Sequence, residues 1–178
     1  MFICYIIVTK PEDFQMAEII LAPHKKYNVN KHNWASVFLA GGISNCPDWQ
    51  KVVCQYLKPF NGIIVYNPRR EDWTPDISSE EQVAWEYEQL EQCNILAFWF
   101  SAGSLNPIAL YELGRWANHT TTRPLIIGCD PDYERTLDVK MQTMLSRSDV
   151  IWVTNLNDYA HRIIIEAEKI NQSKLHNH

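Results

Sequence analysis

From Ser36 onward, short apolar runs alternate with amphipathic segments. This alternation restricts the fold more than any other feature, because it is typical of a parallel sheet whose two faces are covered by helices. The runs contain few polar residues, as expected for strands buried on both faces. We therefore predict an α/β fold with five parallel strands at residues 37–40, 62–66, 95–100, 125–128 and 150–154.

The segments between these strands have the apolar spacing of helices. Ser78 or Ser79 is expected to cap the second helix. In the fourth helix, the residues expected to be buried are Leu137, Met141, Met144 and Leu145. The predicted helices lie at residues 47–57, 79–90, 107–117, 132–146 and 157–170.

Five strands connected in this way favour the flavodoxin-like, doubly wound order 2-1-3-4-5. In that order the first and third strands are neighbours, and ligands bind at the carboxyl ends of the strands where the winding reverses. The turn at residues 41–44 is therefore expected to lie beside the turn at residues 101–107.

A single domain over residues 1–178 is the simplest organisation for a chain of this length. Residues 1–35 are expected to form a short N-terminal extension with a possible edge strand at 18–23, and the apolar residues 1–8 a peripheral strand. Residues 172–178 are expected to fray, because they contain one apolar residue.

Charge and cysteine content exclude several classes of protein. The net charge of −5 argues against a nucleic-acid partner. The apolar N-terminal segment is too short for a signal or a membrane span. Five cysteines and six scattered histidines show no metal-binding spacing, so buried thiols in a reducing cytoplasm and no metal are expected.

Glu112 is the first candidate catalytic residue. It follows the apolar run at residues 95–100 and lies in a helix that begins near Pro107, with apolar neighbours around it. A partly desolvated glutamate at the carboxyl end of a strand suits a nucleophile or a general base. The alternative is a surface glutamate that pairs with Arg115 three residues later.

Glu86 is the second candidate, because it borders the apolar stripe of the helix that precedes the third strand. The same helix contains Glu80, Glu81, Glu88 and Glu91, so a solvated acidic face is the alternative interpretation.

Two glycines and a serine follow the first strand. Gly41 and Gly42 permit close approach of backbone N–H groups to a ligand, and Ser44 adds a hydroxyl. Turn geometry alone is the simpler explanation for the glycines.

Arg69, Arg70 and Trp73 follow the second strand at the same edge of the sheet. The arginines suit a bidentate phosphate contact or, alternatively, ion pairs with Glu86 or Asp72. Trp73 suits stacking on a base, or a place in the core or at its rim.

Four segments in order, at residues 37–43, 67–70, 85–86 and 111–114, resemble the nucleoside 2-deoxyribosyltransferase family. The resemblance extends over roughly residues 19–153. It implies a flavodoxin-like fold without a cofactor. It also implies a double displacement at C1′ of a 2-deoxynucleoside, in which a glutamate displaces the base and a second base or water takes the sugar.

The same resemblance assigns roles to individual residues. Glu112 corresponds to the nucleophile, and Glu86 replaces an aspartate that handles the proton of the base. Asn106 replaces an acid that holds a sugar hydroxyl, and Phe38 replaces a tyrosine that touches the nucleophile. Gly42 stands where related hydrolases have a serine for a 5′-phosphate. A homo-oligomer, in which a neighbouring subunit completes each site, is also implied.

The leading hypothesis is cleavage of the N-glycosidic bond of a 2-deoxynucleoside or nucleotide through a covalent intermediate. Transfer to a base and transfer to water both stay open, as does the preference for purine or pyrimidine. The alternatives are a hydrolase of NAD-type N-glycosides and a non-catalytic nucleotide-sensing module.

Overall fold

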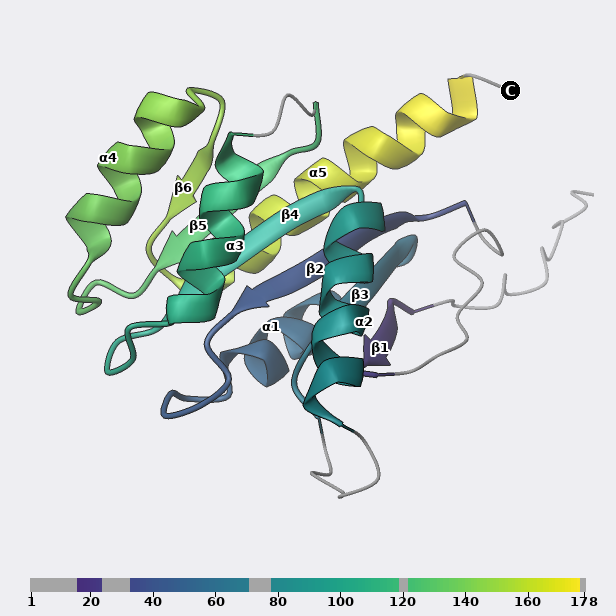
Figure 1. The fold of residues 1–178 in the computed structure, drawn as a ribbon. Helices are drawn as coiled ribbons and strands as arrows, with labels where there is room; N and C mark the ends of the chain where they lie inside the picture. Colours follow the sequence, from purple (N-terminus) through teal and green to yellow (C-terminus); the bar gives the residue numbers. More distant parts are fainter. Residues whose placement is uncertain (1–15, 24–32, 71–77, 119–121, 177–178) are drawn as a thin grey trace, which may run out of the picture.

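The computed structural model describes residues 16–23, 33–70, 78–118 and 122–176, which contain a parallel six-stranded sheet (Figure 1). The strand order is β1-β3-β2-β4-β5-β6. The strands are β1 (Glu18–Leu21), β2 (Ala35–Gly41), β3 (Ile63–Asn67), β4 (Ile95–Phe100), β5 (Leu125–Cys129) and β6 (Ile151–Val153).

The predicted order of five strands is confirmed, because β3, β2, β4, β5 and β6 follow it without interruption. The sixth strand, β1, is the edge strand considered for residues 18–23, and it pairs in parallel with β3. The fold is thus an α/β fold of broadly flavodoxin-like type. The peripheral strand expected at residues 1–8 lies outside the described residues, and the single-domain organisation stays a prediction.

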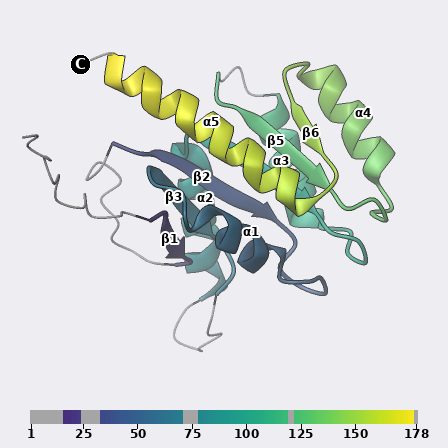
Figure 2. The same cartoon turned by 180° about the vertical axis from the view of Figure 1, so that it is seen from behind.

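In the described part of the chain, five helices cover the sheet, two on one face and three on the other. Figure 1 shows α2, α3 and α4 on one side, and Figure 2 shows α1 and α5 on the opposite side. None of the helices in the described part of the chain is both long and apolar enough to cross a membrane. The helices are α1 (Trp49–Leu57), α2 (Ser79–Gln92), α3 (Pro107–Ala117), α4 (Thr136–Ser146) and α5 (Leu156–His176).

Side-chain caps define where the helices beside the site begin. Ser78 caps α2, because its hydroxyl accepts a hydrogen bond from the Glu81 N–H at 3.1 Å. Asp48 caps α1 by accepting from the Lys51 N–H at 3.0 Å. Such caps satisfy N–H groups that have no partner inside the helix.

Each face of the sheet has its own hydrophobic core. Trp49 and Tyr159 pack against Trp99 on the face covered by α1 and α5. Trp85 and Trp116 belong to the core on the face covered by α2, α3 and α4. Strands β2, β3, β4 and β5 are buried on both sides, which confirms the interpretation of their apolar sequences.

The fourth helix differs from its prediction. It begins at Thr136 rather than near residue 132, and its buried residues are Val139 and Thr143. The four residues expected to be buried are exposed, with Leu137 at 72% and Leu145 at 80%. The four residues do form an apolar stripe, but no element in the described part of the chain covers it. The prediction had assumed that an apolar stripe must face its own core.

The last helix continues beyond its expected end near residue 170. Asn171 holds it to the sheet, because its side chain accepts from the Ala35 N–H and donates to the Gly62 carbonyl, each at 2.7 Å. The Lys174 ammonium donates to the Trp34 carbonyl at 3.0 Å. These contacts tie the helix to the start of β2 and extend it to His176.

Candidate active site

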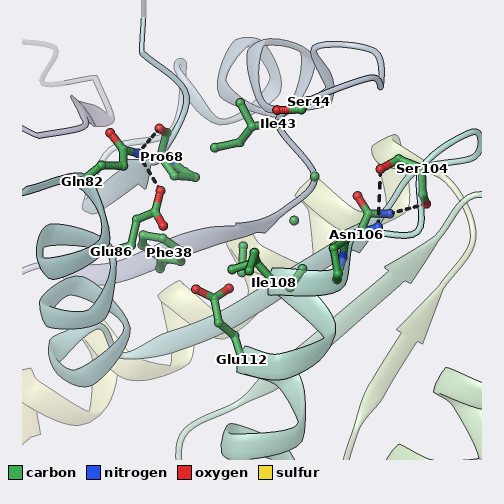
Figure 3. A pocket seen from close by; sticks show the side chains of 15 residues that line it. Phe38, Ile43, Ser44, Pro68, Gln82, Glu86, Ser104, Asn106, Ile108 and Glu112 are labelled. Carbon is green, nitrogen blue, oxygen red and sulfur yellow. Dashed lines mark hydrogen bonds between the residues drawn. The ribbon is translucent and has the colours of Figure 1, made fainter. Parts of the chain in front are cut away.

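A pocket of about 310 Å³ lies at the carboxyl ends of β2, β3 and β4, between α2 and α3 (Figure 3). This is the predicted reversal point of the sheet, and the turns after β2 and β4 meet there as expected. Its lining residues are Phe38, Ala40, Gly41, Gly42, Ile43, Ser44, Pro68, Gln82, Glu86, Ser104, Asn106, Pro107, Ile108, Ala109 and Glu112.

Glu112 projects into the pocket from the second turn of α3 and is half-buried. Its carboxylate has no hydrogen-bond or ion-pair partner within the described part of the chain. The alternative pairing with Arg115 is wrong, because that guanidinium binds Glu91 and donates to the Tyr87 hydroxyl at 2.8 Å. A half-buried carboxylate without a protein partner is available to a ligand.

Glu86 enters the same pocket from α2 and is also half-buried. Its Oε1 accepts a hydrogen bond from Gln82 Nε2 at 2.6 Å. The alternative of a solvated acidic face describes Glu80, Glu88 and Glu91, which are exposed, but not Glu86. Two carboxyl groups from different helices therefore share one cavity.

The environment perturbs both carboxyl groups. Burial and, to a lesser degree, the nearby charge of Glu86 together raise the pKa of Glu112 to about 8. Burial also raises the pKa of Glu86, whereas the hydrogen bond from Gln82 and the charge of Arg70 act in the opposite direction. We infer that the pair holds one proton near neutral pH, and its apparent pKa values belong to both groups together.

Asn106 lies at the start of α3 in a left-handed conformation with φ of 50° and ψ of 51°. Its Nδ2 donates to the carbonyl of Ser104 at 2.9 Å and to that of Ser101 at 3.4 Å. Its Oδ1 is buried and has no partner among the described residues. Because a buried acceptor is nearly always satisfied, this oxygen is a candidate contact for a ligand.

Phe38, Gly41, Gly42 and Ser44 also line the pocket, as expected. Phe38 is buried in β2 with its ring 6.1 Å from that of Trp85. Ser44 is exposed at the rim. The predicted substrate-binding residues of the first strand and its turn are thus brought together, although their roles stay predictions.

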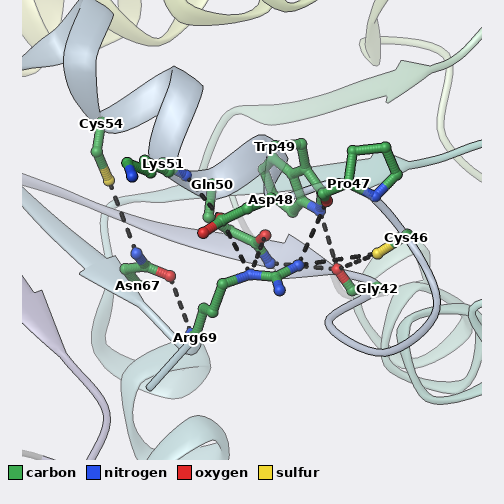
Figure 4. A network of polar contacts seen from close by, with 10 residues as sticks. All are labelled: Gly42, Cys46, Pro47, Asp48, Trp49, Gln50, Lys51, Cys54, Asn67 and Arg69. Atoms are coloured by element: carbon green, nitrogen blue, oxygen red, sulfur yellow. Dashed lines mark hydrogen bonds and ion pairs between the residues drawn. The ribbon is translucent and has the colours of Figure 1, made fainter. Parts of the chain in front are cut away.

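The two arginines lie away from the pocket. Arg69 Nε is 3.0 Å from Asp48 Oδ1 and 3.1 Å from Gln50 Oε1, on the side of α1 (Figure 4). Arg70 is buried and donates to Gln82 Oε1. Neither guanidinium is positioned to hold a phosphate inside the cavity. Trp73 and Asp72 lie outside the described residues.

The turn after β2 is held from behind by α1. The Gly42 carbonyl accepts hydrogen bonds from Trp49 Nε1 at 3.0 Å and Cys46 Sγ at 3.1 Å, and from Gln50 Nε2 at 3.4 Å (Figure 4). Arg69 binds Gln50 and so supports this network. Arg69 therefore contacts the wall of the site indirectly, which its position in the sequence did not reveal.

Sequence reasoning missed several lining residues, chiefly Gln82, Pro68, Ser104 and Ile108. Gln82 was detectable, because it precedes Glu86 by four residues and so lies on the same face of the helix. No group of three or more His, Cys, Asp or Glu side chains suited to a metal occurs in the described residues.

A family model described as "Nucleoside 2-deoxyribosyltransferase like" matches residues 34–133, more than half of the chain. The chain therefore belongs to the nucleoside 2-deoxyribosyltransferase-like family, as the resemblance had indicated.

A solved structure titled "Crystal structure of conserved protein from Enterococcus faecalis V583" shares 12% sequence identity with this chain. The alignment covers 76% of this chain and 98% of that chain, with a TM-score of 0.49. A likeness of this degree carries no argument about function. No curated protein matches the chain.

Proposed function

We propose that the protein cleaves the N-glycosidic bond of a 2-deoxynucleoside through a covalent intermediate on Glu112. One observation carries the proposal: two half-buried carboxyl groups line the same cavity at the reversal point of the sheet. Glu86 is held by Gln82, and Glu112 has no partner among the residues that the structure describes. Membership of the family supports the substrate class.

In the first step, an ionised Glu112 oxygen forms a bond to C1′ while the bond between C1′ and the base nitrogen breaks. The electron pair of that bond stays on the base, and the proton of Glu86 passes to it. A carboxylate at close range stabilises the cation-like sugar of the transition state. General acid help of this kind contributes roughly 10²- to 10⁴-fold.

In the second step, an acceptor nitrogen or a water oxygen attacks C1′. The ester bond breaks, its electron pair returns to the Glu112 carboxylate, and Glu86 takes the proton of the acceptor. A base as acceptor yields a new nucleoside, and water yields free deoxyribose. The single proton of the carboxyl pair is thus used and regained in each cycle.

Asn106 supplies the contact to the sugar. Its buried Oδ1 has no described partner and accepts a hydrogen bond from a sugar hydroxyl. The amide orientation is determined by the carbonyls of Ser101 and Ser104, both of which accept from Nδ2. A neutral acceptor in this place avoids a third carboxylate in the cavity.

The substrate is an uncharged nucleoside rather than its monophosphate. Among the described residues, the pocket lining includes two carboxyl groups and no lysine or arginine, so a phosphate would meet repulsion without a described cation to balance it. The same reasoning disfavours NAD, whose diphosphate would need compensation. We expect faster cleavage of nucleosides than of 5′-monophosphates, and the reverse preference would contradict this assignment.

Release of free base, followed by chromatography, tests the proposal. The purified protein is incubated with a panel of deoxynucleosides, with and without an acceptor base, and Glu112→Gln is measured in parallel. Release that requires Glu112 is the expected result, and a new nucleoside identifies a transferase. Tight nucleoside binding without any release would instead favour the sensing module.

We further propose a homo-oligomer that uses the surface of α3 and α4. Seven large apolar side chains there are about half or more exposed, far more than scattered surface residues account for. Ile108 belongs to both this surface and the pocket, so a second copy would reach the pocket mouth. The seven residues are Leu105, Ile108, Tyr111, Leu137, Met141, Met144 and Leu145.

The described cysteines agree with a cytoplasmic location, which we also propose. Cys54, Cys93 and Cys129 are buried free thiols, and Cys46 is a half-buried one. Free thiols are typical of a reducing compartment.

A further inference from the structure

The side-chain amide of Gln82 lies between a guanidinium and a carboxyl group. Its Nε2 donates to the Pro68 carbonyl at 2.8 Å and to Glu86 Oε1 at 2.6 Å (Figure 3). Its Oε1 accepts from Arg70 Nε. Gln82 is itself buried, so both amide hydrogens and the amide oxygen have their partners inside the protein.

These partners allow only one orientation of the amide. Arginine can only donate and a backbone carbonyl can only accept. Exchanging the oxygen and nitrogen of Gln82 would place N–H groups against the guanidinium of Arg70 and an oxygen against the Pro68 carbonyl. The Gln82 N–H must therefore face Glu86.

This orientation has a consequence for the proton of Glu86. An oxygen that accepts an N–H bond at 2.6 Å has no room for a proton of its own in that direction, so Oε1 is the acceptor oxygen of the carboxyl group. The proton then belongs on Oε2, which has no partner among the described residues.

We propose that Gln82 is a positioning residue that keeps the acidic proton of Glu86 on Oε2, turned into the pocket toward the leaving base. The inference rests on the proposed function, in which Glu86 protonates that base. Arg70 supports it from behind by fixing the amide. Within the described residues, two charged groups face Glu86: Arg70, through Gln82, from the segment after β3, and Glu112 from α3.

The test compares Gln82→Met with Gln89→Met. Methionine has a similar length but no donor, and Gln89 is a buried glutamine on the same helix whose side chain has no hydrogen bond in the described residues. Each variant is assayed with a natural deoxynucleoside and with a deoxyriboside whose acidic leaving group departs without a proton.

We expect Gln82→Met to lower kcat for the natural nucleoside by roughly 10- to 100-fold, since proton delivery is misdirected. With the substrate whose leaving group is acidic, kcat should fall by less than about 3-fold, because departure of that group needs no general acid. Gln89→Met should match the wild type on both substrates. A merely structural role would lower both rates together, and this result would overturn the proposal, as would an unchanged or raised kcat in Gln82→Met.

A second variant and a second measurement guard against misfolding. Gln82→Leu also removes the donor and adds no charge beside Glu86, so the same selective loss is expected. In the Glu112→Gln background, carboxyl ¹³C NMR should show that Gln82→Met raises the pKa of Glu86, because the hydrogen bond from Gln82 lowers it. An unchanged pKa of Glu86 would refute the contact between the two side chains. If the wild type releases no base from any nucleoside, the proposed function fails, whereas an active wild type that Gln82→Met matches refutes only the role of Gln82.

Discussion

The side-chain oxygen of Asn106 lies so close to Gly42 that a Cβ atom on Gly42 would be only 1.8 Å from it. The two residues come from the turns after β2 and β4, which are far apart in the sequence and adjacent in the sheet. Glycine is required at position 42 by this contact, not by an unusual φ angle. The contact also holds the buried Oδ1 of Asn106 at the wall of the pocket.

Gly42→Ala should therefore displace Asn106 or the turn itself. We expect a loss of stability of about 1–3 kcal/mol, as for other overpacked sites, and at least about a 10-fold loss of base release. Urea denaturation and the chromatographic assay measure the two effects. Gly114→Ala is the matched control, because its Cβ would meet nothing within 4 Å in helix α3, and it should retain activity. Equal behaviour of the two variants would contradict the close contact.

The pH dependence of base release should be bell-shaped for a natural nucleoside. Release needs an ionised Glu112 and a proton on Glu86, so the rate rises as the carboxyl pair loses its first proton and falls as it loses its second, near the pKa of about 8 that Glu112 has beside Glu86. A deoxyriboside with an acidic leaving group needs no proton, and its rate should rise to a plateau above that pH. A fall at high pH for both substrates would refute the general-acid role.

Replacing Glu86 should shift the ionisation of Glu112. The charge of Glu86 raises the pKa of Glu112, so Glu86→Gln should lower it. With the acidic leaving group, the rate of Glu86→Gln should reach its plateau at a lower pH than that of the wild type. Unchanged midpoints in the two profiles would show that the carboxyl groups do not interact.

Stability should depend on pH through Glu112. Its pKa is about 8 in the folded protein and near the ordinary value of 4.5 when unfolded, so the folded state binds more protons between these values. The wild type should lose stability as pH rises through this window. The Glu112→Gln variant does not show this loss, so its free energy of unfolding near pH 8 should exceed that of the wild type by about 1–3 kcal/mol. The difference is smaller than the full pKa shift would give, because Glu112 is partly exposed to solvent.

Urea denaturation at a series of pH values checks this difference. Glu168→Gln changes an exposed glutamate of α5 and serves as the control, with a stability difference that does not vary over the same range. A Glu112→Gln variant that followed the wild type in parallel at every pH would contradict the raised pKa.

The Asn106 contact predicts a dependence on the sugar. Asn106→Ala should lower kcat/KM for a deoxynucleoside about 10-fold, because the variant loses one hydrogen bond between a buried acceptor and the sugar. The wild type should lose a similar factor on a substrate that lacks the 3′-hydroxyl, whereas the variant should discriminate little between the two substrates. If the losses from Asn106→Ala and from removal of the 3′-hydroxyl were additive, the hydroxyl would not bind Asn106.

The apolar surface of α3 and α4 predicts self-association. Analytical ultracentrifugation should show an oligomer for the wild type and a smaller species for Leu145→Glu, because a charge on an exposed apolar contact is costly to bury. Val83→Glu, on the exposed face of α2, controls for added charge. A wild type that sediments as a monomer at all concentrations would refute the proposal.

Much of the architecture was determined by local sequence. Residues 95–100 are apolar at every position before the Ser101 turn, and a short run of this kind, rich in aromatic residues, favours a strand buried on both faces. The cap expected at Ser78 or Ser79 and the proline at position 107 predicted helix starts that the structure reproduces, with Ser78 as the cap. Strand order followed from the connectivity of parallel strands, because each crossover needs a helix.

The candidate site was predictable in part for the same reason. Carboxyl ends of parallel strands meet at one edge, so Gly42, Asn106 and Glu112 could be placed together from sequence. Which way a long polar side chain turns depends on partners remote in the sequence. Arg69 turned to Asp48 and Gln50, and Arg70 to Gln82, rather than to the cavity.

The sequence by itself determined that this chain forms a parallel sheet between two helical layers, since periodicity and connectivity are local properties, and it offered Glu112 and Glu86 as candidates at the carboxyl ends of the strands. Only the tertiary structure decided that Gln82 binds Glu86 while Glu112 has no partner among the residues that the structure describes. It also decided that the apolar stripe of α4 faces outward. Those outcomes depend on distances between residues far apart in the chain. Burial and hydrogen bonding act through such distances, and no local pattern encodes them.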